Sequence, residues 1–238
     1  MKNNFDFYFG KWGKLASVVC FSALLLLMAS CLDDDDRANE TTPVAYVSIY
    51  HASPNAPELD VFVDDRQVNR LEFTDYTGYL NFYTGERNFK INPFNASNAL
   101  IDTTVNFDDG GFYSMFIVNN LSSVEALTVR DSASSPASGK AKIRFINLSP
   151  DANALDVISG EGADPLFAAQ AFKQPSNFVE LDAAESSFVI KPAGGTDELV
   201  SVSDINIQPG KFYTIIARGF ANPPSGNNNE LSLEVIVN

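Results

Sequence analysis

Cysteine, histidine and basic residues are scarce in this sequence, and each scarcity excludes a class of function. Two cysteines, Cys20 and Cys31, and one histidine, His51, are too few for a zinc or iron site. Sixteen Lys and Arg stand against 30 Asp and Glu, for a formal net charge of −14, which argues against binding nucleic acid or anionic lipid. A glycine-rich phosphate loop with its lysine is also absent.

The first 30 residues have the order of a secretory signal peptide. Lysines precede an apolar run, residues 15–28, and the small residues Ala29 and Ser30 come directly before Cys31. The run is shorter than the about 20 residues that span a bilayer, so a membrane-anchor helix is the weaker interpretation. Residues 28–31 resemble a bacterial lipobox, which implies cleavage after Ser30 and lipid on the Cys31 sulfur. The mature chain would then have no second cysteine for a disulfide.

Four aspartates, residues 33–36, follow the predicted lipidation site. A solvated acidic tether accounts for them on physical grounds alone. The run also resembles the surface-export signal of Bacteroidota lipoproteins, which implies a lipid-anchored protein on the outer face of the outer membrane. The predicted partners are therefore the membrane, through lipid, and an extracellular protein or glycan.

The rest of the chain contains one pattern twice. Residues 45–61 match residues 141–157 without a gap, and a Gly-x-Phe-Tyr motif recurs near the end of each copy. A period near 100 residues is the size of a domain, not of a solenoid repeat. The repeated positions are Ser53, Pro54, Asp60 and Tyr113 in the first copy and Ser149, Pro150, Asp156 and Tyr213 in the second.

Apolar residues alternate with polar ones in short runs within each copy, and no stretch shows a sustained helical period with caps. Turn signals such as the acidic-glycine run at residues 108–111 separate these runs. The pattern predicts an all-β protein with two tandem antiparallel β-sandwiches, immunoglobulin-like or transthyretin-like. The expected order is a signal peptide (1–30), a lipidated tether (31–43), a first sandwich (44–130), a linker (131–139) and a second sandwich (140–238).

The two motifs resemble domain of unknown function family 4397, found in secreted and surface proteins of bacteria. The resemblance rests on residues 51–61 and 110–113 in the first copy, and on residues 147–157 and 210–214 in the second. The second copy lacks the histidine of the family pattern and has Asn147 there. The resemblance implies paired β-sandwich domains outside the cytoplasm, and it implies no reaction.

The residues give little support to catalysis. His51 would be the base of any triad, but the second copy keeps its frame without it, so a structural imidazole is favoured. Asp60 and Asp156 are expected to accept backbone N–H groups from the Ser-Pro loop, with a ligand-binding or cation-binding carboxylate as the alternative. No cofactor is predicted, and a structural calcium ion stays an alternative because short oxygen-rich runs surround both aspartates.

Aromatic residues offer the other clue to function. Tyr76, Tyr79 and Tyr83 lie in one segment of the first copy, and exposed rings can stack on sugars or anchor a protein interface. Tyr76 and Tyr83 have no aromatic match in the second copy. We therefore expect a non-catalytic envelope module that binds a protein or glycan. The alternatives are an accessory glycan-binding lipoprotein of a polysaccharide-uptake system and a hydrolase with converging carboxylates.

Overall fold

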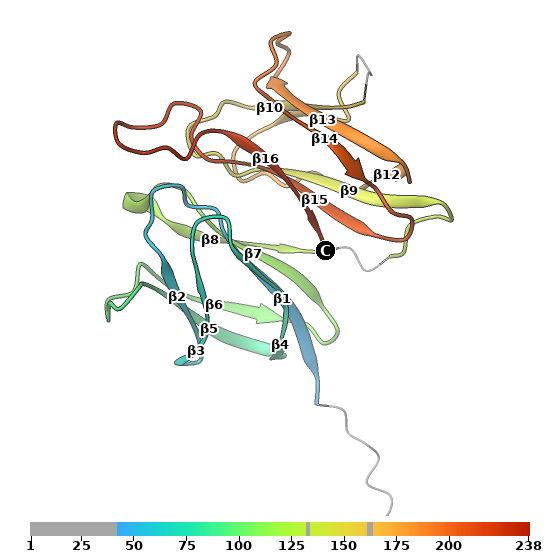
Figure 1. Ribbon diagram of the computed structural model, residues 1–238. Helices are drawn as coiled ribbons and strands as arrows, with labels where there is room; N and C mark the ends of the chain where they lie inside the picture. Colours follow the sequence, from blue (N-terminus) through green and yellow to red (C-terminus); the bar gives the residue numbers. More distant parts are fainter. Residues whose placement is uncertain (1–41, 132–133, 161–163) are drawn as a thin grey trace, which may run out of the picture. The chain divides into compact units, whose positions relative to one another are not determined.

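The computed structural model of the protein describes residues 42–131, 134–160 and 164–238 (Figure 1). The predicted signal peptide, Cys31 and the aspartates of the tether lie outside these residues. Residues Pro43–Asn238 form one compact unit. The described part is all-β apart from one 3-10 turn, η1 (Leu121–Ser123), and it contains no helix long and apolar enough to cross a membrane.

Strands β1 to β8 form two four-stranded sheets, in the orders β4-β1-β7-β8 and β3-β2-β5-β6. The strands are β1 (Val44–His51), β2 (Leu59–Val63), β3 (Arg66–Leu71), β4 (Tyr76–Tyr83), β5 (Gly85–Pro93), β6 (Ile101–Phe107), β7 (Phe112–Val118) and β8 (Glu125–Arg130). Apolar side chains from both sheets meet in one buried cluster, so these strands form the first sandwich.

Strands β9 to β16 repeat this arrangement, with sheet orders β12-β9-β15-β16 and β11-β10-β13-β14. The strands are β9 (Lys140–Asn147), β10 (Leu155–Ser159), β11 (Phe167–Gln170), β12 (Val179–Asp182), β13 (Glu185–Pro192), β14 (Val200–Asn206), β15 (Phe212–Arg218) and β16 (Ser232–Val237). They enclose a second buried cluster. The four sheets confirm the predicted all-β class with two sandwiches.

One strand pair in each sandwich differs from the expected antiparallel pattern. Strand β1 pairs with β7 in parallel, and β9 pairs with β15 in the same way. Parallel neighbours need a long connection, and the intervening strands of each copy supply it. The alternation of apolar residues indicates which side chains are buried, but it does not indicate whether a neighbouring strand runs parallel or antiparallel. The sequence therefore could not predict this pairing.

The outer faces of two sheets also bury apolar side chains. Tyr50 and Phe116 of the first sandwich join Ile146 and Ile216 of the second in a third cluster. These residues are equivalent in pairs, since Tyr50 lies beside Phe116 in the parallel register and Ile146 lies beside Ile216 in the other. The two copies therefore pack through the same face of the repeat, and the cluster holds the two sandwiches together.

A buried ion pair lies in the same contact region. Arg144 Nη2 on β9 is 2.5 Å from Asp131 Oδ1, and the two side chains are 2% and 5% exposed. Ser114 donates to the carboxylate and accepts a hydrogen bond from Arg144, whose Nε also donates to Thr214. Asp131 is the first residue of the segment predicted as a linker, so this end of that segment is part of the packed structure.

Candidate functional site

His51 is fully buried and both of its ring nitrogens are engaged. Nδ1 accepts a hydrogen bond from the Ser53 backbone N–H at 3.3 Å, so the proton lies on Nε2, which donates to the Pro57 carbonyl at 3.1 Å. Asn147 makes the two equivalent bonds in the second copy, to Ser149 N–H and the Asn153 carbonyl. Burial lowers the pKa of His51. The ring is thus a neutral clamp on the Ser-Pro loop.

We expect the variant His51→Asn to fold with nearly unchanged stability at pH 7.5, because Asn147 already performs this role. His51→Leu should lose about 1–3 kcal/mol, since it leaves the Ser53 N–H and the Pro57 carbonyl unpaired. The lowered pKa means that the unfolded state takes up the proton first. His51 therefore destabilises the parent as the pH falls below about 6.5, with a slope of at most about 1.4 kcal/mol per pH unit.

Urea unfolding of the parent, His51→Asn and His51→Leu at pH 7.5 and 5.5 measures both effects. The stability difference between the parent and His51→Asn should shift in favour of the variant at pH 5.5. An equal loss of stability in the Asn and Leu variants at pH 7.5 would contradict the clamp.

The Ser-Pro loop of the first copy is a docking point for the second copy. Ser53 Oγ donates to the Asn119 carbonyl, and the Pro54 carbonyl accepts hydrogen bonds from the side chains of Asn227 and Asn229. In the second copy Ser149 Oγ donates to Asp151, beside Pro150. The polar loop at 222–229 therefore has defined contacts, whereas its composition alone suggests a disordered tip.

The repeated aspartates bind backbone, but in a different loop from the one expected. Asp60 Oδ2 accepts the Asn95 N–H, and Asp156 Oδ2 accepts the Gly194 N–H at the equivalent turn of the second copy. Asp60 Oδ1 also accepts hydrogen bonds from Gln67 and Arg70. The expectation that the N–H donors belong to the Ser-Pro loop is wrong, because the side chains point across the sheet to the turn after the neighbouring strand.

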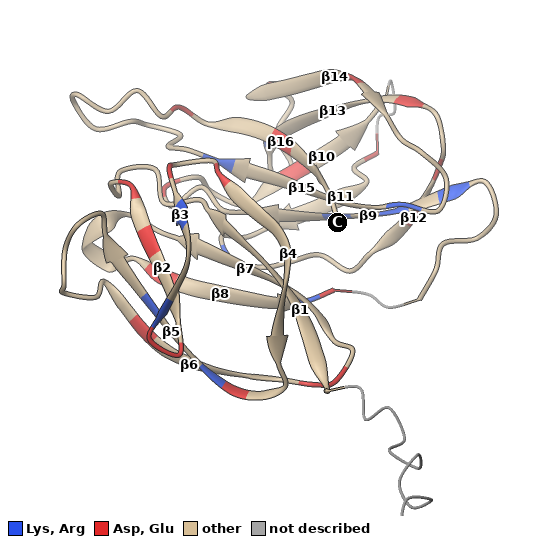
Figure 2. Ribbon diagram, turned by 60° about the horizontal axis from the view of Figure 1, so that its bottom comes forward, with Lys and Arg blue, Asp and Glu red and all other residues tan. Residues whose placement is uncertain are grey.

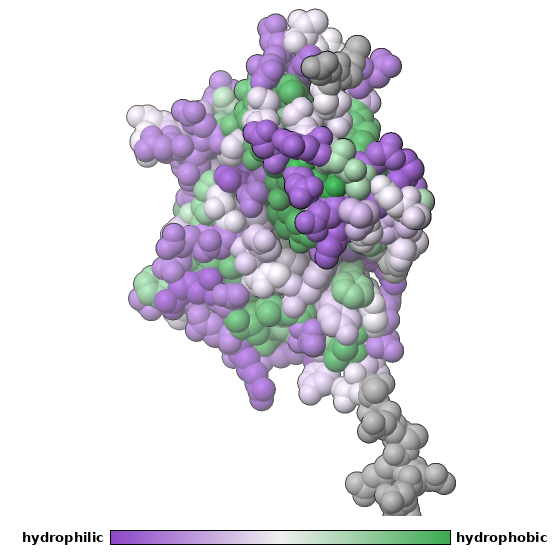
Figure 3. Space-filling model, turned by 45° about the vertical axis from the view of Figure 1, so that its right-hand side comes forward, coloured by the Kyte–Doolittle hydropathy of each residue, from purple (hydrophilic) through white to green (hydrophobic). Residues whose placement is uncertain are grey.

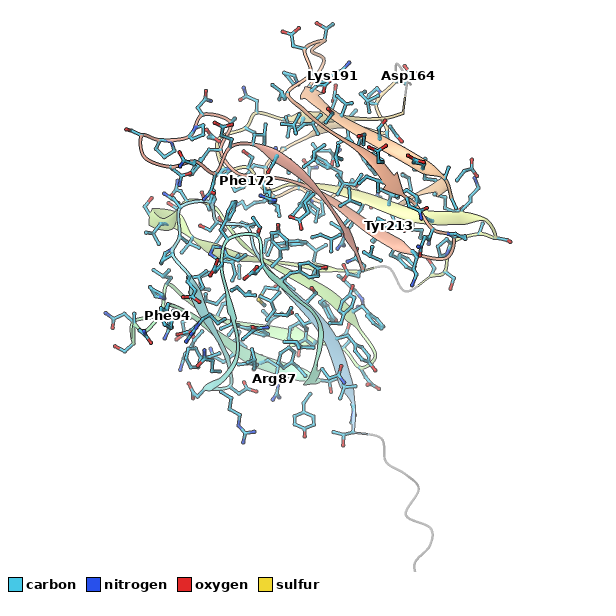
Figure 4. The ribbon with its side chains drawn as sticks, in the orientation of Figure 1. Arg87, Phe94, Asp164, Phe172, Lys191 and Tyr213 are labelled. Carbon is cyan, nitrogen blue, oxygen red and sulfur yellow. The ribbon has the colours of Figure 1, made fainter. Side chains whose placement is uncertain are left out.

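The repeated tyrosines brace a turn in each copy. The hydroxyl of Tyr113 accepts the Asp108 N–H, and the hydroxyl of Tyr213 (labelled in Figure 4) accepts the Gln208 N–H. Both bonds span the tight turn between the two strands that flank it. These motif residues therefore fix loop geometry in both sandwiches.

Tyr76, Tyr79 and Tyr83 share a face of β4 but not a site. A register shift opposite Ser48 and Tyr50, beside Gly78 with its positive φ of 64°, places all three on the outer face of the sheet. Tyr79 donates to Asp131 Oδ2 at 2.6 Å in the contact between the sandwiches. Burial, and then the negative charge of Asp131, raise the pKa of Tyr79. Its ring is thus part of the structural interface.

The other two tyrosines are exposed in different surroundings. Tyr76 is 47% exposed and stacks on Tyr50 with ring centroids 6.2 Å apart. Tyr83 is 63% exposed and borders a lateral groove of about 630 Å³. The groove runs along the edge strands β3 and β4, one from each sheet of the first sandwich. The residues that line it are Val44, Val63, Asp64, Arg66, Val68, Asn81, Phe82, Tyr83 and Arg87.

The groove contains one ion pair and one arginine side chain without a partner among the described residues. Arg87, labelled in Figure 4, lies 2.9 Å from Asp64 through Nη1. Asp64 also accepts the Asn88 N–H, so both of its oxygens are engaged. The side chain of Arg66 is exposed and makes no hydrogen bond or ion pair with any residue that the structure describes. Acidic and basic positions occur together on β2, β3 and β5 in Figure 2.

The second copy does not keep the polar residues of the groove. Asp182 takes the place of Tyr83, since it pairs with the first residue of β9 as Tyr83 pairs with the first residue of β1. Gly160 takes the place of Asp64 at the turn after the second strand of the copy. The shared frame does not need these side chains, so they are candidates for function. The sequence indicates Tyr83 by this divergence, whereas Arg66 and Arg87 were not found.

Another hollow, of about 590 Å³, lies among loops of both copies. Its lining residues are Asn55, Asn120, Leu121, Ser122, Phe220 and Pro224, and none of them is charged. Within the described residues no cluster of three or more His, Cys, Asp or Glu side chains could hold a metal ion. Asp151, in the run considered for calcium, accepts the N–H groups of Ala221 and Asn222.

Residues 45–158 match the sequence model of DUF4397, a domain of unknown function. The DUF4397 match supports the resemblance indicated by the motifs of the first copy and reaches into the second. No curated protein matches the sequence.

Three solved structures are similar to this chain. The first is a streptococcal virulence factor that binds alpha-glucan, with 12% sequence identity and a TM-score of 0.23 over 71% of this chain and 92% of that chain. The second is a family 26 carbohydrate-binding module of Eubacterium rectale in complex with maltoheptaose, with 8% identity and a TM-score of 0.26 over 81% of this chain and 96% of that chain. The third is a candidate cell adhesion protein of Bacteroides eggerthii, with 11% identity and a TM-score of 0.25 over 83% of this chain and 95% of that chain. At these identities and scores the similarity carries no argument about function.

Proposed function

We propose that this chain is a non-catalytic cell-envelope lipoprotein that binds a glycan in the lateral groove of its first sandwich. The observation that carries the proposal is the exposed ring of Tyr83 at the border of a concave site. Aromatic faces stack on sugar rings, and binding sites combine an apolar lining with a few placed polar groups. Val63, Val68 and Phe82 supply the apolar part, and Asn81 and the arginines supply hydrogen-bond donors.

The chemistry of the site supports binding without catalysis. Glycoside hydrolysis uses two carboxyl groups about 5–10 Å apart. Asp64 is the only carboxylate in the lining of the groove, and Arg87 and a backbone N–H engage it. His51 is buried with both nitrogens bonded to backbone groups, so it offers no base to a substrate. On the face in Figure 3, hydrophobic residues form patches between hydrophilic ones.

The proposed location follows from the beginning of the sequence. Residues 28–31 fit a lipobox and the aspartates at 33–36 fit a surface-export signal of Bacteroidota lipoproteins. Both lie outside the described residues. Strand β1 begins at Val44, so a tether of 12 residues, 32–43, would join the lipid on Cys31 to the first sandwich. We propose that the outer membrane carries the module on its outer face.

A glycan array with residues 43–238 tests the proposal, followed by calorimetric titration of any ligand found. Tyr83→Ala should weaken binding about tenfold, the loss expected when about 1.4 kcal/mol of ring stacking is removed. Tyr76→Ala is the matched control, because this tyrosine is also exposed on β4 but does not line the groove. Absence of any glycan ligand, or equal losses in both variants, would overturn the proposal. Capture of a protein ligand through Tyr83 would replace the glycan with a protein partner.

A further inference from the structure

The groove differs in charge from the molecule around it. The chain carries 30 acidic and 16 basic residues, yet the lining of the groove contains two arginines and one aspartate. Because Asp64 is paired with Arg87, the charge of Arg66 is not compensated within the groove. A cation without a partner on so acidic a chain favours an anionic ligand at this position.

The position of Arg66 is fixed by a tight turn. Asp64 and Asp65 connect β2 to β3 with φ values of 49° and 63°, the left-handed conformation of a two-residue hairpin loop. Arg66 therefore pairs directly with Val63, the last residue of β2. Asp65 does not neutralise it in this arrangement, since the Asp65 carboxylate binds Lys90 Nζ at 2.6 Å. The backbone thus presents a guanidinium at the border of the groove.

Arg87 lies on β5, on the other side of β2 from β3, and its guanidinium is held by two neighbouring residues. Its Nη1 donates to Asp64 and its Nη2 donates to the Thr84 carbonyl at 3.4 Å. Its buried Nε has no hydrogen-bond partner among the described residues. A guanidinium held by its neighbours loses little conformational freedom when a ligand binds beside it.

We propose that the groove recognises glycans that contain a hexuronic acid, with the sugar ring on Tyr83 and the carboxylate on Arg66. A guanidinium forms paired, charge-assisted hydrogen bonds with a carboxylate, and a planar ring stacks on a sugar face. Arg66 and Tyr83 lie on the two edge strands that border the same groove, so one ligand can contact both. This inference rests on the proposed function and adds the chemical class of the ligand.

Calorimetric titration with paired probes tests the inference. The acidic probes are oligosaccharides of galacturonate, of mannuronate and guluronate, and of hyaluronan. Each is compared with its carboxyl-reduced form, which keeps the rings and removes the charge. At least one acidic probe should bind at least tenfold more tightly than its reduced form, and this preference should fall as sodium chloride rises from 50 to 300 mM. An oligosaccharide that carries sulfate but no carboxylate distinguishes a general anion site from a carboxylate site.

Arg66→Gln should remove the tenfold preference, so that each acidic probe and its reduced form bind with similar affinity. Lys211→Gln is the control, because it removes one exposed positive charge from the second sandwich. Equal binding of acidic and reduced probes that depends on Tyr83 would overturn the inference and leave the proposed function standing. Preference for the sulfated probe would also overturn it. The inference would also be overturned if no probe bound and the array found either a neutral glycan or no glycan at all.

Discussion

Asp131→Ala is expected to lower the free energy of unfolding by about 3–5 kcal/mol, the loss usual when one partner of a buried ion pair is removed. The variant leaves the guanidinium of Arg144 buried without its carboxylate, in contact with Ser114 and Thr214. The hydroxyl of Tyr79 loses its acceptor at the same time. Urea unfolding, followed by fluorescence and by circular dichroism, measures the loss.

Two further variants separate the ion pair from packing. Replacing both partners, Asp131→Leu with Arg144→Met, should restore most of the lost stability, because a well-packed apolar pair is often as stable as a buried ion pair. Asp182→Ala breaks the exposed pair with Lys140 and should cause no measurable change. A loss in Asp131→Ala no larger than in Asp182→Ala would contradict the role of the buried pair.

The two copies differ in charge at equivalent positions of the contact region. Asp131 and Asn238 are equivalent, since their N–H groups bond to the carbonyls of Phe112 and Phe212. Asn238 accepts a hydrogen bond from Thr214, and Asp131 accepts one from Ser114, at the equivalent position. Of the two, only Asp131 is charged, and Arg144 is the cation opposite it. The two repeat faces therefore carry opposite charges at this point of their contact.

The repeat made the sandwiches predictable, because both copies keep their apolar positions in the same register. Phe89 and Phe188, for example, are both fully buried. The contact between the copies could not be predicted in this way. Arg144 alternates with apolar residues on β9, a pattern typical of a solvent-exposed side chain. It is buried because a partner from outside its strand covers it, and such tertiary contacts leave no local pattern.

The residues of the groove likewise divide into one that the sequence indicates and others that only the fold reveals. Tyr83 could be indicated from the sequence because it breaks the match between the copies. Arg66 and Arg87 could not, since a strand arginine is most often a solvated surface group. Only the fold brings Arg66 and Tyr83 of the edge strands β3 and β4, and Arg87 of the inner strand β5, to one groove. The repeated motif residues recur in both copies because they fix the conformation of loops. His51 and Asn147, for example, accept the same backbone hydrogen bond at equivalent positions.

Cys31→Ser is expected to convert the protein from a fully membrane-retained form to a soluble one. The predicted diacylglyceryl group and the further acyl chain on the amino terminus are the only anchors that the sequence indicates. Each buried methylene contributes about 0.8 kcal/mol, so two or three chains give stable attachment and their loss removes it. Palmitate labelling and fractionation of cells into membrane and soluble parts measure the change.

Cys20→Ser is the matched control, because it changes the other cysteine, which the predicted cleavage removes. It should leave labelling and retention unchanged. Protease treatment of intact cells should remove the sandwiches of the parent if the lipoprotein faces outward, and their survival beside a cleaved surface protein would place it on the inner face. Retention of Cys31→Ser in the membrane, without label, would show that something other than acyl chains on this cysteine holds the protein there.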